Sequence, residues 1–272
     1  MAFFDNRTSL LQLDSLLDLS FSHICNAIFD HHATTVFPFN IFLVVLADDG
    51  QNDSFFEDLD TNRKLPLLKD HAYFFPCGRK MKIDITEGVT LLSFHFNLLY
   101  LHSIDIFFES EPLQMKYDSD FVKKIYFWAN EEKDELKAIC ALKSEVMRFC
   151  LPFWPEDRMQ TLSVFKKYEP VFRFIHDNGN AELTVGDLAE QAQLRQDVFS
   201  RAFSRDLGRS PKKFIQEDLI RKISLRLLSP KKTVKEVSED LKFSSEFYMS
   251  YFFKKHTGYS PRDFQNKFRK HK

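Results

Sequence analysis

The chain has 272 residues, 44% of them hydrophobic, which is enough for two domains with cores and excludes a wholly disordered protein. The net charge of −1 hides a division. Residues 180–272 hold 20 Lys and Arg against 12 Asp and Glu, a net of +8, whereas residues 1–179 hold 18 against 27, a net of −9. This asymmetry favours a polyanion-binding module joined to a domain that does not bind polyanions. Two ordinary domains that differ in charge by chance are the alternative.

The N-terminus shows no basic region followed by a small-residue cleavage site, so we expect no signal peptide. The longest apolar run, Phe39–Ala47, is too short to span a bilayer and predicts a buried strand. We therefore expect a soluble, cytoplasmic protein; if the basic segment binds DNA, the protein would then associate with the nucleoid. Four widely spaced cysteines form no CxxC or zinc-finger array and predict buried free thiols in a reducing cytosol: Cys25, Cys77, Cys140 and Cys150.

Residues 20–110 predict short strands with no long helix between them. The segment FPFNIFLVVLADDG, residues 37–50, is β-rich and ends in an Asp-Gly turn signal. Further along, apolar residues alternate with polar ones in the manner of a half-buried strand: Met81, Ile83 and Ile85. This pattern favours an antiparallel sandwich or barrel.

From about residue 118 the hydrophobic period becomes helical. One expected helix ends at Pro152 and carries an apolar stripe: Leu136, Ile139, Cys140, Leu142 and Val146. A second helix is expected over residues 160–177, where Pro170 either kinks or restarts it. Asn178-Gly179 is a good helix end, and the charge balance changes in the same loop. We therefore expect the domain boundary at 178–181.

A nine-residue pattern occurs twice in the basic segment. DLGRSPKKF (206–214) and HTGYSPRDF (256–264) share Gly, one residue, Ser-Pro, two residues and Phe. We expect the Gly to end a helix, the Ser to cap the next one and the Pro to occupy its first turn. Phe214 and Phe264 should then pack back onto the preceding helix.

Each copy of this pattern follows two short helical segments joined by a tight turn. The copies are offset by 49 residues before the turn and by 50 after it, so the second turn has one extra residue. Such pairs, the second helix ending in basic sequence, fit a helix-turn-helix. The residues expected on their buried faces are mostly apolar, with Ser238 the exception: Val185, Leu188, Ala189, Ala192, Val198, Phe199, Ala202 and Phe203 in the first copy, and Val234, Val237, Ser238, Leu241, Met249 and Phe253 in the second.

One long helix should join the two units, because apolar residues recur at steps of four: Ile215, Leu219, Ile223 and Leu227. A rigid connection fixes the distance between the units. Helices that enter the major groove on one face of DNA must lie about one turn, roughly 34–36 Å, apart. A single chain could therefore address two successive major grooves.

These features resemble the AraC/XylS family of bacterial transcription regulators over residues 180–272. The segment LKFSSEFYMSYFFKKHTGYSP is similar to the family's closing motif, G-F-S-S-x-S-x-F-x-x-x-F-K-x-x-x-G-x-x-P. Two positions depart from the family: Lys242 stands where Gly is favoured, and Tyr251 where Arg is frequent. Gly usually serves at a positive φ, so Lys242 is expected to strain or lengthen the turn. Tyr251 removes a bidentate base contact and leaves a phosphate contact or stacking.

The resemblance implies an α+β fold, with an N-terminal antiparallel β cupin-like barrel, a helical linker and an all-α C-terminal domain with two helix-turn-helix units. The implied domains are 1–115, a cupin-like sensor; 116–179, a linker and dimerisation region; and 180–272, the DNA-binding domain. It also implies a small effector in the barrel, and RNA polymerase and a second copy of the chain as partners beside double-stranded DNA. No membrane partner and no cofactor are expected.

The recognition helices supply the candidate DNA contacts. Arg201 is the best base reader because Arg can contact guanine O6 and N7 together; an ordinary phosphate contact is the alternative. Glu246 either accepts from cytosine N4 or complements the helix dipole. Arg209 is expected to hold phosphate or to be plain surface charge. The candidate DNA-binding residues are Gln196, Asp197, Ser200, Arg201, Arg205, Ser245, Glu246, Phe247, Ser250, Tyr251, Lys254 and Lys255.

Two other classes of function stay open. A cupin-type metalloenzyme would need H-x-H with a nearby Glu, whereas His31 and His32 are adjacent and the next Glu is Glu57. An interaction protein could use the helical repeat to bind another protein. We expect a sequence-specific transcriptional regulator, an activator by family habit, with no catalytic and no metal site. His95 is expected to be structural, and the 31 phenylalanines are expected to fill an unusual core rather than a ligand pocket.

Overall fold

The computed structural model describes residues 17–28, 31–51, 53–101, 103–108, 110, 114–154 and 164–269. In this part of the chain, strands in the N-terminal half are followed by helices, so the α+β class is confirmed. The strands are β1 (Leu17–Ile28), β2 (His31–Val36), β3 (Asn40–Ala47), β4 (Phe55–Asp58), β5 (Arg63–Pro66), β6 (His71–Phe75), β7 (Lys80–Ile85), β8 (Thr90–Tyr100), β9 (Ile104–Asp105) and β10 (Gln114–Tyr117).

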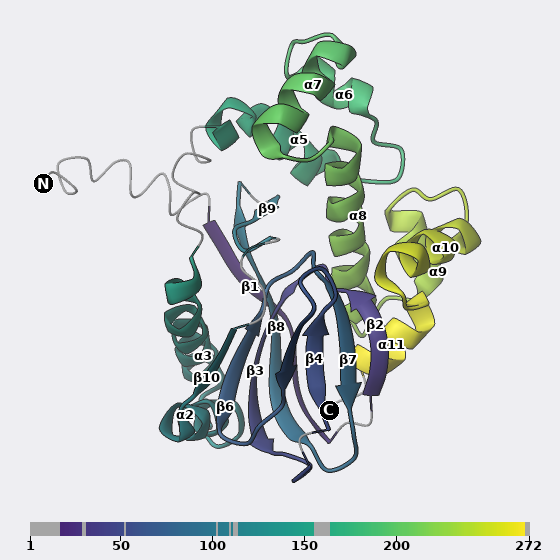
Figure 1. Ribbon diagram of the computed structural model, residues 1–272. Coiled ribbons are helices and arrows are strands. Elements are labelled where there is room, and N and C mark those ends of the chain that lie inside the picture. The colour runs from purple at the N-terminus through teal and green to yellow at the C-terminus, as the bar shows by residue number, and fades with distance from the viewer. Residues whose placement is uncertain are drawn as a thin grey trace, which may run out of the picture.

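The strands form two antiparallel sheets that face each other (Figure 1). One has the order β1-β8-β3-β6-β10, with β9 beside β8, and the other has the order β2-β7-β4-β5. In β7 the expected alternation is confirmed, since Met81 and Ile83 are buried while Lys80 and Lys82 are exposed. β3 is apolar on both faces because one faces the second sheet and the other faces helices.

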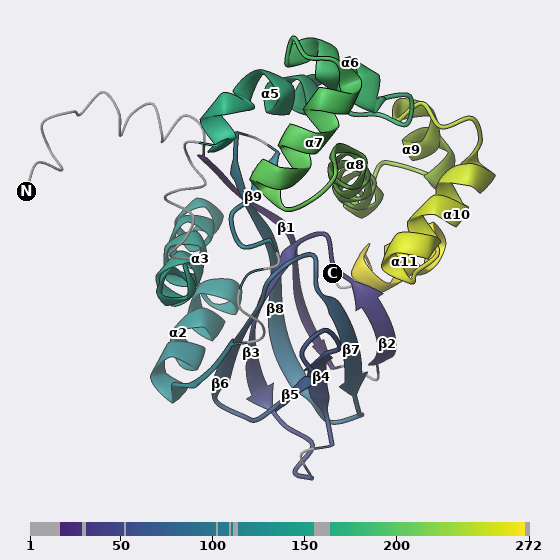
Figure 2. The same ribbon diagram turned by 45° about the horizontal axis from the view of Figure 1, so that its top comes forward.

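The helices are α2 (Ser119–Asn130), α3 (Glu135–Cys150), α5 (Glu169–Asn178), α6 (Val185–Gln191), α7 (Gln196–Leu207), α8 (Pro211–Leu228), α9 (Val234–Asp240), α10 (Glu246–Thr257) and α11 (Pro261–Arg269), with a 3-10 turn, η1 (Leu151–Phe153). α2 and α3 cover one side of the strands (Figure 1). The helices α5 to α7 lie beyond one end of the sheets, α9 to α11 lie on the other side next to β2, and α8 connects the two groups (Figure 1 and Figure 2).

Two expectations for the linker helices need correction. A break between α2 and α3 divides the segment, because Asp134 caps a new helix by accepting from the backbone N of Lys137. Leu136 and Cys140 are exposed, whereas Leu142 and Val146 are buried, since the packed face turns toward α2 and the first sheet. Of the expected buried thiols, Cys77 and Cys150 are confirmed, Cys140 is not, and the Cys25 side chain lies outside the described residues.

The sequence left open whether Pro170 kinks the helix or restarts it, and in the structure Pro170 restarts the helix. Residues 164–167 are helical, a turn follows at Tyr168, and α5 begins at Glu169 with the proline in its first turn. Helix α5 ends at Asn178, followed by Gly179, as expected. No helix among the described residues combines the length and apolar composition needed to cross a membrane.

The two copies of the repeated unit belong to different hydrophobic cores. The outer face of the larger sheet, with Phe42 and Phe94, continues through α2, α3 and α5 to Phe199 and Phe203 of the first unit. The space between the sheets, with Ile41 and Ile83, continues to Phe253, Phe264 and Phe268 of the second unit. Each copy of the repeated unit therefore packs against the sheets through a separate set of apolar contacts.

Candidate functional site

The repeated segments form two helix-turn-helix units, α6–α7 and α9–α10, that begin with the same cap. Thr184 Oγ1 accepts a hydrogen bond from the backbone N of Asp187 at 3.2 Å, and the Asp187 carboxylate accepts one from the backbone N of Thr184 at 2.8 Å. Thr233 and Glu236 repeat both bonds at 3.2 and 2.7 Å. This reciprocal capping satisfies backbone N–H groups at the helix start. The expected Gly, Ser and Pro roles are confirmed at both copies, with Gly208 and Gly258 left-handed.

The departure at Lys242 has a clear geometric meaning. Lys242 has φ +55°, and Gln193, at the equivalent place in the first turn, has φ +54°. After each residue the chain closes in the same way, with the N of Leu194 donating to Ala189 O at 3.0 Å and the N of Phe243 to Ser238 O at 2.9 Å. Both turns therefore hold a side chain in a conformation that favours glycine.

Lys242→Gly should raise the free energy of unfolding by about 0.5–1 kcal/mol. It removes about 1–2 kcal/mol of left-handed strain, and the extra freedom of glycine in the unfolded chain offsets about 0.4–1 kcal/mol of that gain. Urea denaturation checks the prediction. Lys242→Ala is the control, because it keeps the Cβ while removing the exposed 3.4 Å pair with Glu182. Equal stability of the two variants would contradict the strain.

The exposed face of α7 is polar and internally paired. Gln196, Asp197, Arg201 and Arg205 are exposed and Ser200 is half-buried. Arg201 Nη2 lies 3.0 Å from Asp197 Oδ2, and its Nε donates to the Asp197 carbonyl at 3.3 Å. An exposed pair of this kind adds little stability, so its effect is to orient the guanidinium outward along the helix face.

Arg205 is held differently. Its Nε lies 2.9 Å from Asp206, which also accepts from Lys167 Nζ at 2.7 Å and from the Tyr168 hydroxyl at 2.9 Å. The bonds from Lys167, Tyr168 and Arg205 lower the pKa of Asp206 to about 2, against a smaller effect of burial. Asp206 therefore fastens the end of α7 to the segment that precedes α5.

The exposed face of α10 is aromatic. Phe247 is 81% exposed and Tyr251 59%, while Glu246 and Ser250 beside them are half-buried. Ser245 caps the helix by accepting from the backbone N of Tyr248 at 3.1 Å. Lys254 and Lys255 are exposed in the last turn. Sequence reasoning missed Tyr248, which is 52% exposed.

Helix α8 connects the units as one element of 18 residues, about 27 Å long. Its Lys222 ammonium donates to Ile175 O at 2.7 Å and His176 O at 3.0 Å, so it satisfies carbonyls at the end of α5. Asp218 lies 3.0 Å from Lys222 and also pairs with Arg221. Phe214 and Phe264 pack on Phe203 and Phe253, as expected.

The second unit is docked on β2, a contact that the sequence does not predict. Thr35 Oγ1 donates to Thr257 O at 2.5 Å, and the Tyr259 hydroxyl lies 3.1 Å from His31 Nε2. A Cβ on Gly258 would lie 2.6 Å from Thr34 O, whereas one on Gly208 would meet no atom within 4 Å. The glycine thus ends a helix in both copies, and in the second copy it is also a point of close backbone approach.

Helix α11 closes the space between the sheets. Phe268 packs edge-on against His95 at 5.5 Å and Phe39 at 6.5 Å, and His95 stacks on Phe39 at 4.5 Å. Burial, then Lys267 and His32, lower the pKa of His31 to about 3, so that its imidazole is neutral at pH 7. His95 is structural, as expected. No group of three His, Cys, Asp or Glu residues among the described residues could hold a metal ion.

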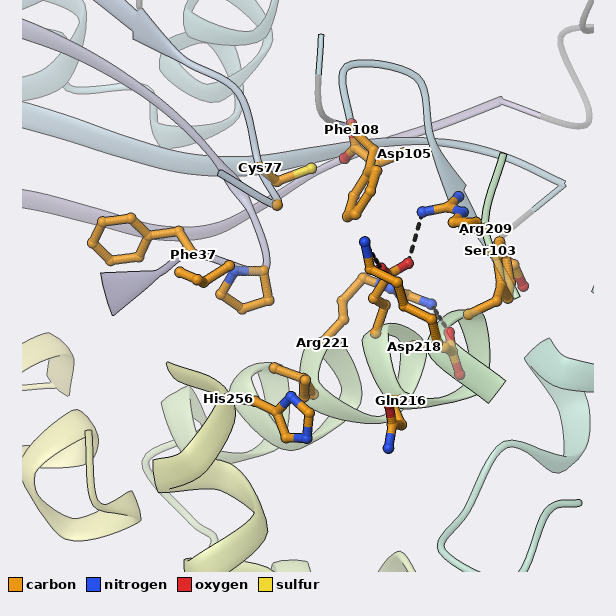
Figure 3. Close-up of a pocket in the computed structure, with 17 residues that line it drawn as sticks. Phe37, Cys77, Ser103, Asp105, Phe108, Arg209, Gln216, Asp218, Arg221 and His256 are labelled. Atoms are coloured by element: carbon orange, nitrogen blue, oxygen red, sulfur yellow. Dashed lines mark hydrogen bonds and ion pairs between the residues drawn. The ribbon is translucent and has the colours of Figure 1, made fainter. Parts of the chain in front are cut away.

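A cavity of about 400 Å³, here called the interface cavity, lies between α8 and the strands (Figure 3). Phe37, Phe108 and Phe214 contribute apolar walls. The charged residues of the lining are Arg209, Lys213 and Arg221 together with Asp105, Glu217 and Asp218. A smaller pocket of about 40 Å³ lies between the sheets, beside Phe268. Side chains of the two sheets and α11 fill the space between them, so among the described residues the cavity beside α8 is larger than this pocket.

Arg209 belongs to this cavity and not to the face formed by α7. Its guanidinium lies 4.3 Å from the Phe108 ring and 4.7 Å from the Phe214 ring, and it pairs with Glu217 at 2.7 Å. The side chain is 12% exposed. The phosphate contact expected of Arg209 therefore does not fit its position.

Asp105 fixes the wall of the cavity. Its carboxylate accepts from Asn40 Nδ2 at 2.9 and 3.0 Å, from Asn97 Nδ2 at 2.9 Å and from the backbone N of Leu98 and Phe107 at 3.2 and 2.9 Å. Burial raises the pKa of Asp105 although these hydrogen bonds oppose the rise. The carboxylate ties β3, β8 and β9 together at one point.

Comparisons with known proteins agree with this geometry. A family model described as a helix-turn-helix domain matches residues 188–267. No curated protein matches the sequence significantly. The fold is similar to ToxT from Vibrio cholerae O395, with 10% identity, 94% of this chain and 99% of that chain covered, and a TM-score of 0.60.

Two further structures of ToxT from Vibrio cholerae give the same result. One, at 11% identity, covers 93% of this chain and 98% of that chain, with a TM-score of 0.56. The other, of wild-type ToxT from strain SCE256 with an unsaturated fatty acid bound, has 10% identity, covers 92% and 94%, and has a TM-score of 0.55. These likenesses show the fold, and the family model identifies residues 188–267 as a helix-turn-helix domain.

Proposed function

We propose that this chain, an AraC/XylS-type regulator by its helix-turn-helix domain and its fold, inserts α7 and α10 into two successive major grooves. The observation that carries the proposal is the pair of capped helix-turn-helix units on one rigid helix, α8. Residues 180–272 bind DNA, residues 116–179 link and dimerise, and residues 1–115 sense. RNA polymerase is the proposed partner of an activator of this kind.

Each expected contact has a role in the proposal. Arg201 reads guanine, with Gln196, Asp197 and Ser200 beside it on α7, and Arg205 holds a phosphate. On α10, Ser245 caps the helix, and Glu246, Phe247, Ser250 and Tyr251 face the bases. Lys254 and Lys255 hold phosphates, which position the protein without reading sequence.

Arg201→Ala should lower affinity for a selected DNA site by about tenfold to a hundredfold, because a bidentate base contact contributes about 1–3 kcal/mol. Fluorescence anisotropy with selected and random duplexes over a range of salt concentrations checks this. Arg173→Ala is the control, since it removes the same charge from an exposed position on α5. Equal binding of selected and random DNA by the wild type at every salt concentration would refute sequence-specific regulation.

The effector is proposed to bind in the interface cavity. A ToxT structure holds an unsaturated fatty acid, and this cavity combines aromatic walls with Arg209, Lys213 and Arg221. Such a lining suits an amphipathic anion whose chain covers the rings. Its carboxylate would approach Lys213, which is 54% exposed and 3.8 Å from Glu217, rather than Arg209 or Arg221, which are closely paired with Glu217 and Asp218. Because α8 and His256 of α10 line the cavity, a bound molecule would touch the elements that position both reading helices.

Lys213→Gln should weaken binding of oleate about tenfold, since a hydrogen bond to a charged group contributes about 1.5–3 kcal/mol and the lysine is half-exposed. Lys212→Gln is the matched control, because Lys212 is adjacent on α8 and does not line the cavity. Isothermal titration calorimetry gives both affinities. Binding of oleate that is unchanged in both variants would place the fatty acid elsewhere.

A further inference from the structure

The two recognition helices differ in chemistry although they arise from one repeated unit. α7 exposes amide, carboxylate and guanidinium groups, with Arg201 77% exposed. α10 exposes Phe247 and Tyr251, which lie one helical turn apart on one face. The buried face of α10 uses Met249 and Phe253, so neither exposed ring is needed for the core of the unit.

The surroundings of this aromatic face indicate a partner rather than a packing error. Large apolar side chains that are exposed together usually mark a binding surface. α10 meets β2 near its C-terminal end, where Thr35 Oγ1 donates to Thr257 O and Gly258 lies against Thr34. Phe247 borders a shallow hollow together with Glu246, Ser250 and Arg262. The rings therefore stay available while the unit is docked.

The charge beside the rings restricts the kind of partner. Lys254 and Lys255 follow on the same helix, and Arg262 stands at the hollow alongside the single carboxylate of Glu246. Because the three cations outnumber this carboxylate, the face suits a partner that carries negative charge next to apolar groups. In the major groove of DNA the only apolar group on a base edge is the thymine C5-methyl, and the phosphates flank it. Double-stranded DNA matches both requirements.

We propose that Phe247 and Tyr251 read thymine methyl groups, so that the second unit recognises T·A pairs by apolar contact. This inference rests on the proposed function. It makes the operator a pair of unlike halves, one read by the arginine of α7 and the other by the rings of α10. It also gives a physical role to Tyr251, which stands where the family favours arginine.

The test removes one methyl at a time. A duplex selected from random sequence by the full chain has each thymine replaced in turn by deoxyuridine, which differs from thymidine only by the C5 methyl. For the wild type, affinity should fall about fourfold at each contacted thymine, the ratio that corresponds to roughly 0.8 kcal/mol per buried CH₂-sized group. Uncontacted thymines should show no change.

Protein variants assign the effect to particular rings. In Phe247→Ala, deoxyuridine and thymine should bind equally at the positions that this ring contacts, and overall affinity should fall about fourfold to fifteenfold if it covers one or two methyls. Tyr248→Ala is the matched control. Tyr248 is an exposed aromatic residue on the same helix, and its ring lies 5.9 Å from the Phe243 ring. It should keep the full deoxyuridine sensitivity.

The outcomes separate this inference from the function beneath it. If no duplex is selected over random DNA, the proposed function fails. If a duplex is selected but deoxyuridine binds as well as thymine at every position, methyl readout is overturned while the function stands. Sensitivity that persists undiminished in both Phe247→Ala and Tyr251→Ala would also overturn it.

Discussion

Replacing Gly258 by alanine is expected to lower the free energy of unfolding by about 2–5 kcal/mol. Left-handed strain accounts for about 1–2 kcal/mol. The new Cβ would lie 2.6 Å from the carbonyl oxygen of Thr34, and forced overpacking of this kind costs about 1–3 kcal/mol more. Urea denaturation of the full chain measures the loss.

Gly208→Ala is the matched control, because Gly208 ends α7 as Gly258 ends α10. Its φ is +70°, and its new Cβ would meet no atom within 4 Å. The expected cost is therefore only the strain of about 1–2 kcal/mol. Hydrogen exchange at Thr34 and Thr35 should rise in Gly258→Ala alone. Equal losses in the two variants would show that β2 does not approach the second unit.

Asp105→Ala should destabilise the chain by at least about 3 kcal/mol. The substitution leaves Asn40 Nδ2 and the backbone N of Leu98 and Phe107 without an acceptor, whereas Asn97 Nδ2 keeps its bond to Pro38 O at 3.2 Å. Each unsatisfied buried polar group costs about 1–3 kcal/mol. Asp105→Asn should have a smaller effect, because its amide oxygen can still accept. Thermal and urea denaturation measure both. Asp120→Asn, at a carboxylate that is 93% exposed, is the control and should change nothing.

The Asp105 prediction also has a pH dependence. Burial raises the pKa of Asp105 in the folded chain above its unfolded value, so the folded state binds the proton more tightly. The contribution of this carboxyl to stability is therefore greatest at low pH and declines as pH rises through the folded pKa. The difference between wild type and Asp105→Ala should shrink in that interval. A difference that grows with pH would mean that the hydrogen bonds outweigh burial.

Much of the local structure follows from short patterns in the sequence. Alternation at Met81, Ile83 and Ile85 predicts β7, and steps of four from Ile215 to Leu227 predict α8. The doubled Gly-x-Ser-Pro-x-x-Phe pattern predicts both helix ends. These succeed because hydrogen bonding and capping within helices involve residues no more than about four positions apart.

The linker helices show where such patterns fail. The stripe that begins at Leu136 is apolar at helical spacing, yet Leu136 is 73% exposed while Val146 is buried. Periodicity gives the face that a helix can bury, but not how far along the helix a partner extends. Cys140 was expected to be buried for the same reason and is exposed where α3 is not covered.

The candidate DNA-binding residues could be proposed from the sequence because the repeat itself marks which helix of each unit faces outward. The interface cavity could not be predicted from the sequence. The sequence predicted a phosphate contact for Arg209, since an arginine beside a recognition helix is usually exposed. In the structure, Phe108 and Glu217 hold its side chain against the strands. Phe108 lies about a hundred residues earlier in the chain, and no local pattern connects the two.

The sequence by itself determined the two helix-turn-helix units, the helix between them and the separation of an acidic N-terminal part from a basic C-terminal part, because these depend on composition and on neighbours within a few residues. Only the tertiary structure decided that the two copies attach to the strands in different ways. Thr35 and Thr257, 222 positions apart, join the second unit to β2, and Phe268 closes the space between the sheets. Such contacts depend on how whole elements fill a shared volume, which identical motifs cannot specify.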